Sequence, residues 1–302
     1  MAITFVGSAA IANTNSTQTR QVNGFLKDTG SGTDIMTAAD VALDDVIILC
    51  TAKAATSNIP TTTPTAGIYS TAFSPIGSSI YSNGTSDALL HVWAAKITSL
   101  PSAATNVLLT IAASGGTTVA QTSVAFILRG VDFANLIALT GGAQRVDATG
   151  TASAVPDPPA VTPSGTVPWL MAIGAGAHTS IHSAYTIPTG LNTSFNHWRT
   201  VLNNTPSQKS NIGAGFLENW NSGTHGASPN CPPFGGGVTG AAASWAASVI
   251  VIPALAAGAT GQMKVWNGSA WVAKPVKVWN GSAWVVKPLK YWNGSAWVVT
   301  PY

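Results

Sequence analysis

The sequence predicts an all-β protein, an antiparallel β-sandwich or barrel followed by a small repetitive tail. Charged residues make up 8% of the 302 residues, against roughly 25% in an ordinary soluble domain. The chain therefore lacks the charged residues that helix bundles and coiled coils place on their solvent-facing sides. Short apolar runs alternate with turn-forming residues, which is typical of sandwiches and barrels. The C-terminal segment repeats one 13-residue unit.

Seven apolar runs are expected to form the strands of the body. Each is short, and most are bounded by Gly, Pro, Asn or Thr, as strands in antiparallel sheets are. In chain order, the runs lie at residues 3–6, 45–50, 88–97, 106–111, 124–131, 168–173 and 245–252.

Two further segments are predicted to fall outside this regular pattern of strands. Residues 36–43 have the composition of one short helix. Residues 178–240 are rich in asparagine and glycine, so we expect long loops with short strands between them. In β-sandwiches, loops of this kind commonly hold the residues that bind a partner or ligand.

The uncharged segment 240–258 has the composition of a membrane span. However, it contains the β-branched run Val249–Ile252 and then Pro253. Such a run ended by proline is typical of a buried strand, so we expect no membrane insertion. The N-terminal residues 1–10 lack the basic region and long apolar run of a signal peptide.

The composition changes near residue 258, so we expect a sandwich body over 1–257 and a tail over 258–302. The tail holds three copies of one unit, at 264–276, 277–289 and 290–302. Each copy contains the sequence WNGSAW, in which Asn-Gly is a strong hairpin signal. The spacing predicts that Trp266 pairs with Trp271, Trp279 with Trp284 and Trp292 with Trp297, and that Val265 pairs with Val272.

A single hairpin of this size is marginally stable in water, so the three units need something to cover their faces. Three interpretations follow. The tail joins copies of the chain, with a trimer favoured; it forms a small stack that caps the chain; or its six tryptophans form a platform for a ligand such as a sugar. The six residues are Trp266, Trp271, Trp279, Trp284, Trp292 and Trp297.

The charge is distributed unevenly along the chain. Five of the thirteen basic residues are lysines after residue 263, and no acidic residue follows Glu218. The rest of the chain has eight basic and ten acidic residues, a net charge of −2. A nucleic-acid-binding body would be basic, so we expect no nucleic-acid partner. The tail lysines have a second interpretation, since lysines at the edges of β-strands commonly prevent unwanted pairing with other strands.

No catalytic or cofactor motif is present, and we expect no enzyme activity and no cofactor. His178 and His182 have helical metal-ligand spacing, but they lie in a Gly- and Ser-rich segment without a neighbouring glutamate, so we expect no metal site. Asp132, Asp147 and Asp157 do not form a recognisable acid pair. Cys50 and Cys231 match no metal or redox motif, and two buried free thiols are favoured over a disulfide.

The repeated K-V-W-N-G-S-A-W-V units resemble those at the ends of many tailed-bacteriophage virion proteins, often labelled minor tail proteins. The opening MAITFVGSA and the segments at 45–49, 126–132 and 245–252 are similar to a jelly-roll-like β-sandwich in the same phage proteins. This resemblance implies a jelly-roll-like body and a structural or host-contact role without catalysis.

The resemblance implies that the chain is a structural virion component, made in the host cytoplasm and placed at a tail tip or in a tail fibre. Its partners would be copies of itself, other virion proteins and a host surface glycan. Two alternatives stay open, a carbohydrate-binding module and a capsid decoration or head-fibre protein. The long Asn- and Gly-rich region at 178–240 departs from the pattern of these phage proteins.

Overall fold

The structure is a computed structural model. It describes residues 2–13, 16–27, 34–55, 63–82, 87–113, 119–138, 143–147, 155–161, 168–178, 183–186, 196–205, 207–218, 225–230, 234–236, 244–255, 262–269, 271–287, 290–292 and 297–299. The protein is nearly all β, with 59% strand and 5% helix, which confirms the predicted fold class. Residue contacts divide it into a body, Ala2–Ala254, and a tail that begins at Leu255.

The first part of the body forms two antiparallel sheets. The larger has the strand order β1-β9-β3-β7-β5, with β6 also paired to β7, and the smaller has the order β2-β8-β4. The strands are β1 (Thr4–Asn13), β2 (Gln18–Gln21), β3 (Val46–Ala55), β4 (Thr65–Ala66), β5 (Ser74–Pro75), β6 (Ile80–Tyr81), β7 (Asp87–Lys96), β8 (Val107–Ile111) and β9 (Gln121–Arg129). Two 3₁₀ turns, η1 (Val22–Gly24) and η2 (Ala38–Asp40), lie between them.

The second part of the body repeats this arrangement after the short helix α1 (Phe133–Ala138). Its larger sheet has the order β10-β16-β12-β14-β13, and β11 pairs with β15 in a smaller one. The strands are β10 (Ala143–Asp147), β11 (Pro159–Val161), β12 (Trp169–His178), β13 (Asn196–Asn203), β14 (Lys209–Leu217), β15 (His225–Asn230) and β16 (Ser244–Ile252).

Each part has the strand order of a jelly roll, in which the last strand lies between the first and the third and the intervening strands form a second sheet. The order β1-β9-β3-β7 corresponds to β10-β16-β12-β14. The inward-facing residues Ile48 and Cys50 of β3 correspond to Met171 and Ile173 of β12. The body is therefore two jelly-roll-like halves within one compact unit, which refines the single sandwich expected from the sequence.

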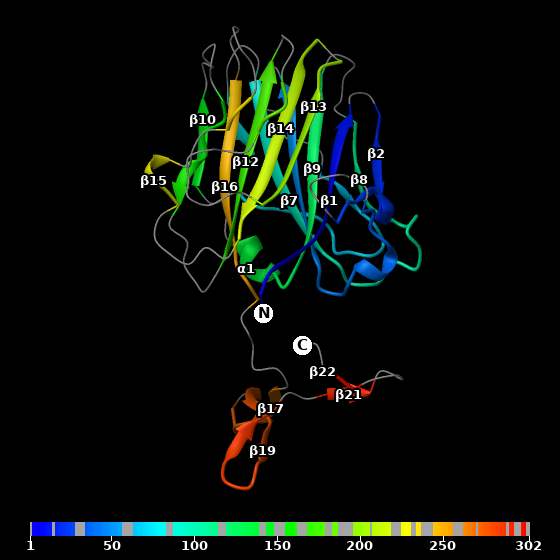
Figure 1. Cartoon of the computed structure of the whole chain (residues 1–302), viewed down its shortest axis with the longest axis vertical. Helices are drawn as coiled ribbons and strands as arrows, with labels where there is room; N and C mark the ends of the chain where they lie inside the picture. Colours follow the sequence, from blue (N-terminus) through cyan, green and yellow to red (C-terminus); the bar gives the residue numbers. More distant parts are fainter. Residues whose placement is uncertain are drawn as a thin grey trace. The chain divides into compact units, whose positions relative to one another are not determined.

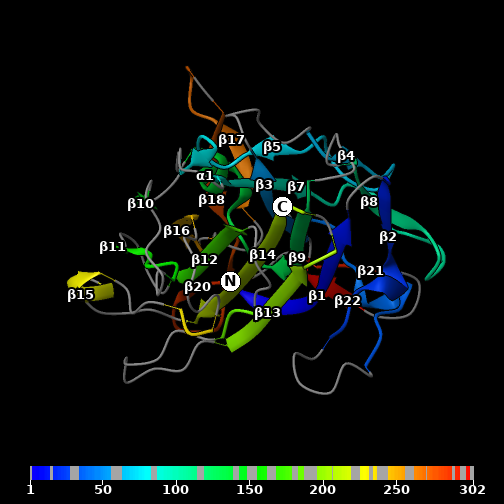
Figure 2. The same ribbon diagram turned by 90° about the horizontal axis from the view of Figure 1, so that it is seen from above.

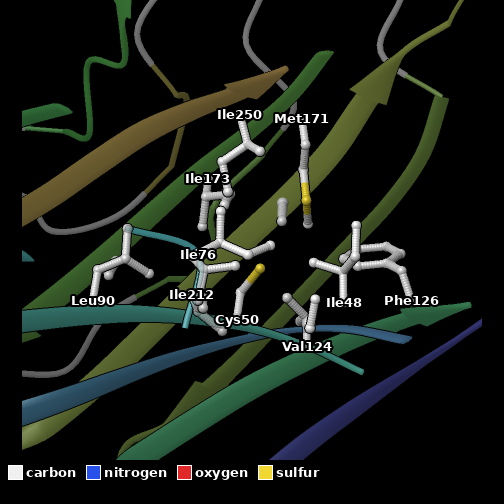
Figure 3. Packing of buried hydrophobic residues seen from close by; sticks show 14 of the residues in the cluster. Ile48, Cys50, Ile76, Leu90, Val124, Phe126, Met171, Ile173, Ile212 and Ile250 are labelled. Atoms are coloured by element: carbon white, nitrogen blue, oxygen red, sulfur yellow. The ribbon is translucent and has the colours of Figure 1, made fainter. Parts of the chain in front are cut away.

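The two larger sheets pack face to face, and the smaller sheets cover their outer sides (Figures 1 and 2). The central core lies between the larger sheets, where Ile48 and Phe126 of one meet Met171 and Ile250 of the other (Figure 3). A second apolar cluster lies between the first large sheet and β8. The middle strands are thus buried on both faces, which explains why they are continuous apolar runs rather than alternating ones.

The outer face of the second large sheet packs against aromatic side chains. A side chain at Gly174 of β12 would collide with Phe234, and one at Gly213 of β14 would lie 2.7 Å from Trp198. Glycine at these positions leaves room for the rings. The outer faces of β12 and β14 therefore depend on glycine for packing.

The prediction of long loops with short strands over 178–240 is wrong in part. Two long strands, β13 and β14, lie in this region, and β14 is buried along most of its length. The strand pattern is hard to recognise in the sequence because glycines occupy outward-facing positions of the sheet. Aromatic rings from other segments pack there in place of large side chains of the strands themselves. Residues 179–182, 187–195, 206, 219–224, 231–233 and 237–240 lie outside the described residues.

The other expected elements agree more closely with the structure. Each of the seven apolar runs contributes to a strand. Residues 36–43 form only the 3₁₀ turn η2, in which Thr37 and Asp40 make a capping box. Residues 244–252 form strand β16, and within the described ranges no helix is long and apolar enough to cross a membrane.

Candidate functional site: the tryptophan hairpins

The tail contains three separate two-stranded sheets, one for each repeat. Their strands are β17 (Gln262–Trp266), β18 (Trp271–Pro275), β19 (Lys277–Trp279), β20 (Trp284–Val286), β21 (Lys290–Trp292) and β22 (Trp297–Val299). The register pairs Trp266 with Trp271, Trp279 with Trp284 and Trp292 with Trp297. The predicted cross-strand pairing is therefore confirmed.

The turn of the middle hairpin explains why every repeat contains Asn-Gly-Ser-Ala. The Asn280 Oδ1 atom accepts hydrogen bonds from the backbone N–H groups of Ser282 and Ala283, at 2.9 and 2.8 Å. Gly281 has a φ of +103°, a conformation that residues with a side chain rarely adopt. The Asn side chain thus holds the chain in a turn that glycine makes accessible.

Hydrogen bonding places the two tryptophans of the middle hairpin close together. The backbone N–H of Asn280 donates to Ala283 O at 3.0 Å, and that of Lys287 donates to Val276 O at 3.0 Å. Because hydrogen-bonded and non-hydrogen-bonded pairs alternate along an antiparallel ladder, Trp279 and Trp284 form a non-hydrogen-bonded pair, where side chains lie closest. Their ring centroids are 5.8 Å apart and their planes meet at 59°.

Both faces of the middle hairpin are exposed in the single chain. On one face, Trp279 is 51% and Trp284 is 65% exposed. On the other, Val278 is 49% exposed. Since period-2 alternation places Lys277 on the tryptophan face, that face is both aromatic and cationic. Trp266 of the first hairpin is exposed to a similar degree.

Exposed apolar surface of this kind is typical of a binding surface. Isolated exposed apolar residues are ordinary, but clustered ones indicate contact with a partner. Here tryptophans recur at a fixed spacing in three equivalent hairpins, so the tail can contact a partner several times. The side chains of Trp271, Trp292 and Trp297 lie outside the described set.

Among the described residues, the other candidates from the sequence are not brought together into a metal site. His178 is buried at the end of β12, and His182 lies outside the described residues. Asp132 accepts a hydrogen bond from the backbone of Asn135 in α1. Asp147 ends β10 opposite Trp245. Among the described residues, no group of three or more His, Cys, Asp or Glu is placed to hold a metal.

Cys50 is a free thiol buried in the central core, and burial raises its pKa well above the usual range. Cys231 lies outside the described residues. The Cys50 thiol therefore behaves as a small apolar side chain in the core.

One polar pair was not anticipated from the sequence. His197 Nε2 lies 2.7 Å from Glu218 Oε1, and the imidazole stacks on Phe5 of β1 with centroids 3.8 Å apart. These residues are far apart in the chain, and no local motif connects them. His197 and Glu218 both belong to the second half, and the stacking of His197 on Phe5 of β1 links the two halves of the body.

Comparison of the chain with protein-family models, curated proteins and solved structures found no match.

Proposed function

We propose that this chain is a structural protein of a tailed-phage virion, in a minor tail or fibre position, whose tryptophan hairpins attach it to copies of itself. The observation that carries the proposal is the exposure of Trp279 and Trp284, a cross-strand pair repeated in three units. The resemblance of these units to the ends of phage virion proteins supports the location.

The energetics support a contact role for the hairpins. Burying a tryptophan side chain is worth up to a few kcal/mol at about 25 cal/mol per Å² of apolar surface. A single hairpin contact would be weak, but three linked contacts reinforce one another because the second and third form at high effective concentration. A tail of three similar hairpins is therefore suited to holding an assembly together.

The test is the oligomeric state of the full-length chain. We expect light scattering to show an oligomer, favoured to be a trimer. Trp279→Ser with Trp284→Ser should weaken it, and serine at all six tail tryptophans should leave a monomer. Val278→Thr is the matched control, since it keeps a β-branched residue on the other face. A wild-type monomer, or an oligomer unaffected by six substitutions, would contradict the assembly role.

Location in the particle is tested separately. Antibodies against the body, viewed by immunogold electron microscopy of purified particles, should label tails. Labelling of capsids would instead support the alternative of a decoration or head-fibre protein. Absence of the chain from purified particles would contradict the virion proposal altogether.

A carbohydrate-binding module is the second candidate. The specific observation in its favour is the combination of half-exposed indole rings with a lysine on one hairpin face. Glycan-array binding that disappears with Trp279→Ser and Trp284→Ser, in a chain that is monomeric before the substitutions, would favour this candidate.

A further inference from the structure

The chain exposes a second apolar surface, on loops of the body. Ile68 is 85%, Leu100 is 53% and Leu43 is 50% exposed. They lie in three loops of the first half, and their own side chains are not part of the apolar clusters of the body. The large exposed apolar side chains of the described residues are thus on the hairpins, on these three loops and at Ile35.

Hydrogen bonds hold the three loops together. The backbone N–H of Asp44 donates to Ile97 O at 3.0 Å, which fixes the loop of Leu43 beside the end of β7. The Ser99 Oγ atom donates to Ile68 O at 3.2 Å, which fixes the loop of Ile68 beside that of Leu100. The apolar side chains are therefore presented by a connected loop cluster, as a binding surface requires.

Three aspartates belong to the loop of Leu43 or are linked to it: Asp44 follows Leu43 in the chain, and Lys27 connects Asp34 to Asp40 of η2. Asp34 and Asp44 are more than half exposed, and Asp40 is about a quarter exposed. Lys27 pairs with Asp34 and Asp40, and Lys96 pairs with Asp44, so the three aspartates and two lysines have a net charge of −1. We call Leu43, Ile68 and Leu100 with Asp34, Asp40 and Asp44 the acidic loop surface.

The hairpins have the opposite charge. The tail holds five lysines and no acidic residue, and Lys277 shares a face with Trp279 and Trp284. Stacking the tails of several copies directly on one another would bring these lysines together with no acid to pair them, and like charges in contact oppose association. The acidic loop surface offers apolar side chains together with carboxylates.

We infer that the hairpins of one copy dock on the acidic loop surface of a second copy. This inference rests on the proposed assembly role and names the partner surface. A cyclic trimer needs two different, complementary surfaces on every chain, because each copy contacts its neighbours head to tail. The tail is one such surface and the acidic loop surface is the other.

The experiment combines two full-length variants that each lack one surface. The tail variant has serine at all six tail tryptophans. The loop variant carries Leu43→Ser, Ile68→Ser and Leu100→Ser, at exposed positions where the fold should tolerate them. Each variant alone should be monomeric. An equimolar mixture should form a one-to-one complex of twice the 30.7 kDa chain mass, since one partner keeps its tail and the other its loops.

Each alternative gives a different result. If the loop variant assembles as the wild type does while the tail variant does not, the tails associate with each other, and the inference is wrong although the assembly role stands. If the mixture stays monomeric, the two surfaces do not pair. If the wild type is a monomer, both the inference and the assembly role are wrong. Should the triple loop variant unfold by circular dichroism, Ile68→Ser alone replaces it, with a several-fold weaker assembly expected.

Salt provides an independent measurement on the wild type. Because opposite charges contribute to docking, raising sodium chloride from about 50 to 500 mM should weaken assembly several-fold. Purely apolar stacking of tails would be unchanged or strengthened, and that result would also overturn the inference.

Discussion

His197 Nε2 lies 2.7 Å from Glu218 Oε1, although the His197 backbone has a left-handed φ of 52°. This conformation accompanies an irregularity in β13 between Asn196 and Arg199. Two residues later, the Arg199 Nε atom donates to Ser8 Oγ of β1 at 2.5 Å. Side chains rather than a backbone ladder therefore join β13 to β1 at this edge of the two sheets.

The first prediction concerns the pKa of His197. Burial lowers this pKa, and the Glu218 carboxylate partly opposes the effect. Glu218→Gln should therefore lower the pKa of His197 further, because the charge that favours the imidazolium is gone. An NMR titration of the imidazole carbons measures the change, and a higher pKa in the variant would show that Glu218 does not act on His197 in this way.

The second prediction concerns acid stability. Burial lowers the pKa of His91 to about 4, against about 6.5 in the unfolded chain. Between these values the unfolded state binds more protons, so the free energy of unfolding should fall as the pH falls from 6.5 to 4.

Urea unfolding at several pH values measures this slope, to which His91 should contribute up to about 1.4 kcal/mol per pH unit. His91→Phe keeps a ring beside Trp93 and should flatten the slope. If the free energy of unfolding depends on pH equally in the variant and the wild type, groups other than His91 cause the loss of stability in acid.

The third prediction compares two neighbouring aspartates. Asp45 is fully buried and accepts hydrogen bonds from Arg129 Nε and Nη2, at 2.8 and 2.9 Å. Asp45→Asn removes the charge opposite Arg129 and weakens two charge-assisted hydrogen bonds, so it should destabilise the body by about 1.5–3 kcal/mol; Arg129 itself is 42% exposed, so water partly compensates its charge. Asp44→Asn is the control, since the exposed pair of Asp44 with Lys96 should contribute less than about 1 kcal/mol.

Chemical denaturation at one low protein concentration compares the two variants, so that changes in assembly do not enter. Similar losses at both positions would mean that burial of Asp45 does not make its pair with Arg129 more important than the surface pair.

The fourth prediction tests the contact between glycine and aromatic rings on the second large sheet. Gly174→Ala should force Phe234 and Pro156 to move, because the new methyl group would overlap both. Overpacking of this kind typically costs about 1–3 kcal/mol. Gly24→Ala is the control, since its methyl group would meet only the flexible side chain of Arg20, at 3.2 Å. Equal melting temperatures for the two variants would contradict this account of the sheet.

Elements of the fold could be predicted from the sequence where a short run of neighbouring residues determines the local structure. Val249–Ile252 is a β-branched run ended by proline, and it forms the end of β16. The WNGSAW units were sufficient to predict the hairpin register because the turn determines the pairing. By contrast, β14 was concealed because Gly213 and Gly215 stand where other strands carry large side chains.

The acidic loop surface was not predictable from the sequence either. Leu43, Ile68 and Leu100 are ordinary apolar residues in the sequence, and only the folded structure shows that they are exposed and that hydrogen bonds connect their loops. The same holds for His197 and Glu218, whose pairing depends on how β13 and β14 align. Interactions between distant segments carry no local signature.

The face-to-face packing of the two halves has a consequence for synthesis on the ribosome. The inner face of the first large sheet is complete once β9 ends at Arg129, but the sheet that covers it is finished only when β16 ends at Ile252. At about 5–20 residues per second, translating the intervening stretch takes roughly 6–25 seconds. During that interval Ile48, Cys50 and Phe126 lack a complete partner sheet, so the apolar inner face of the nascent first half is open to aggregation.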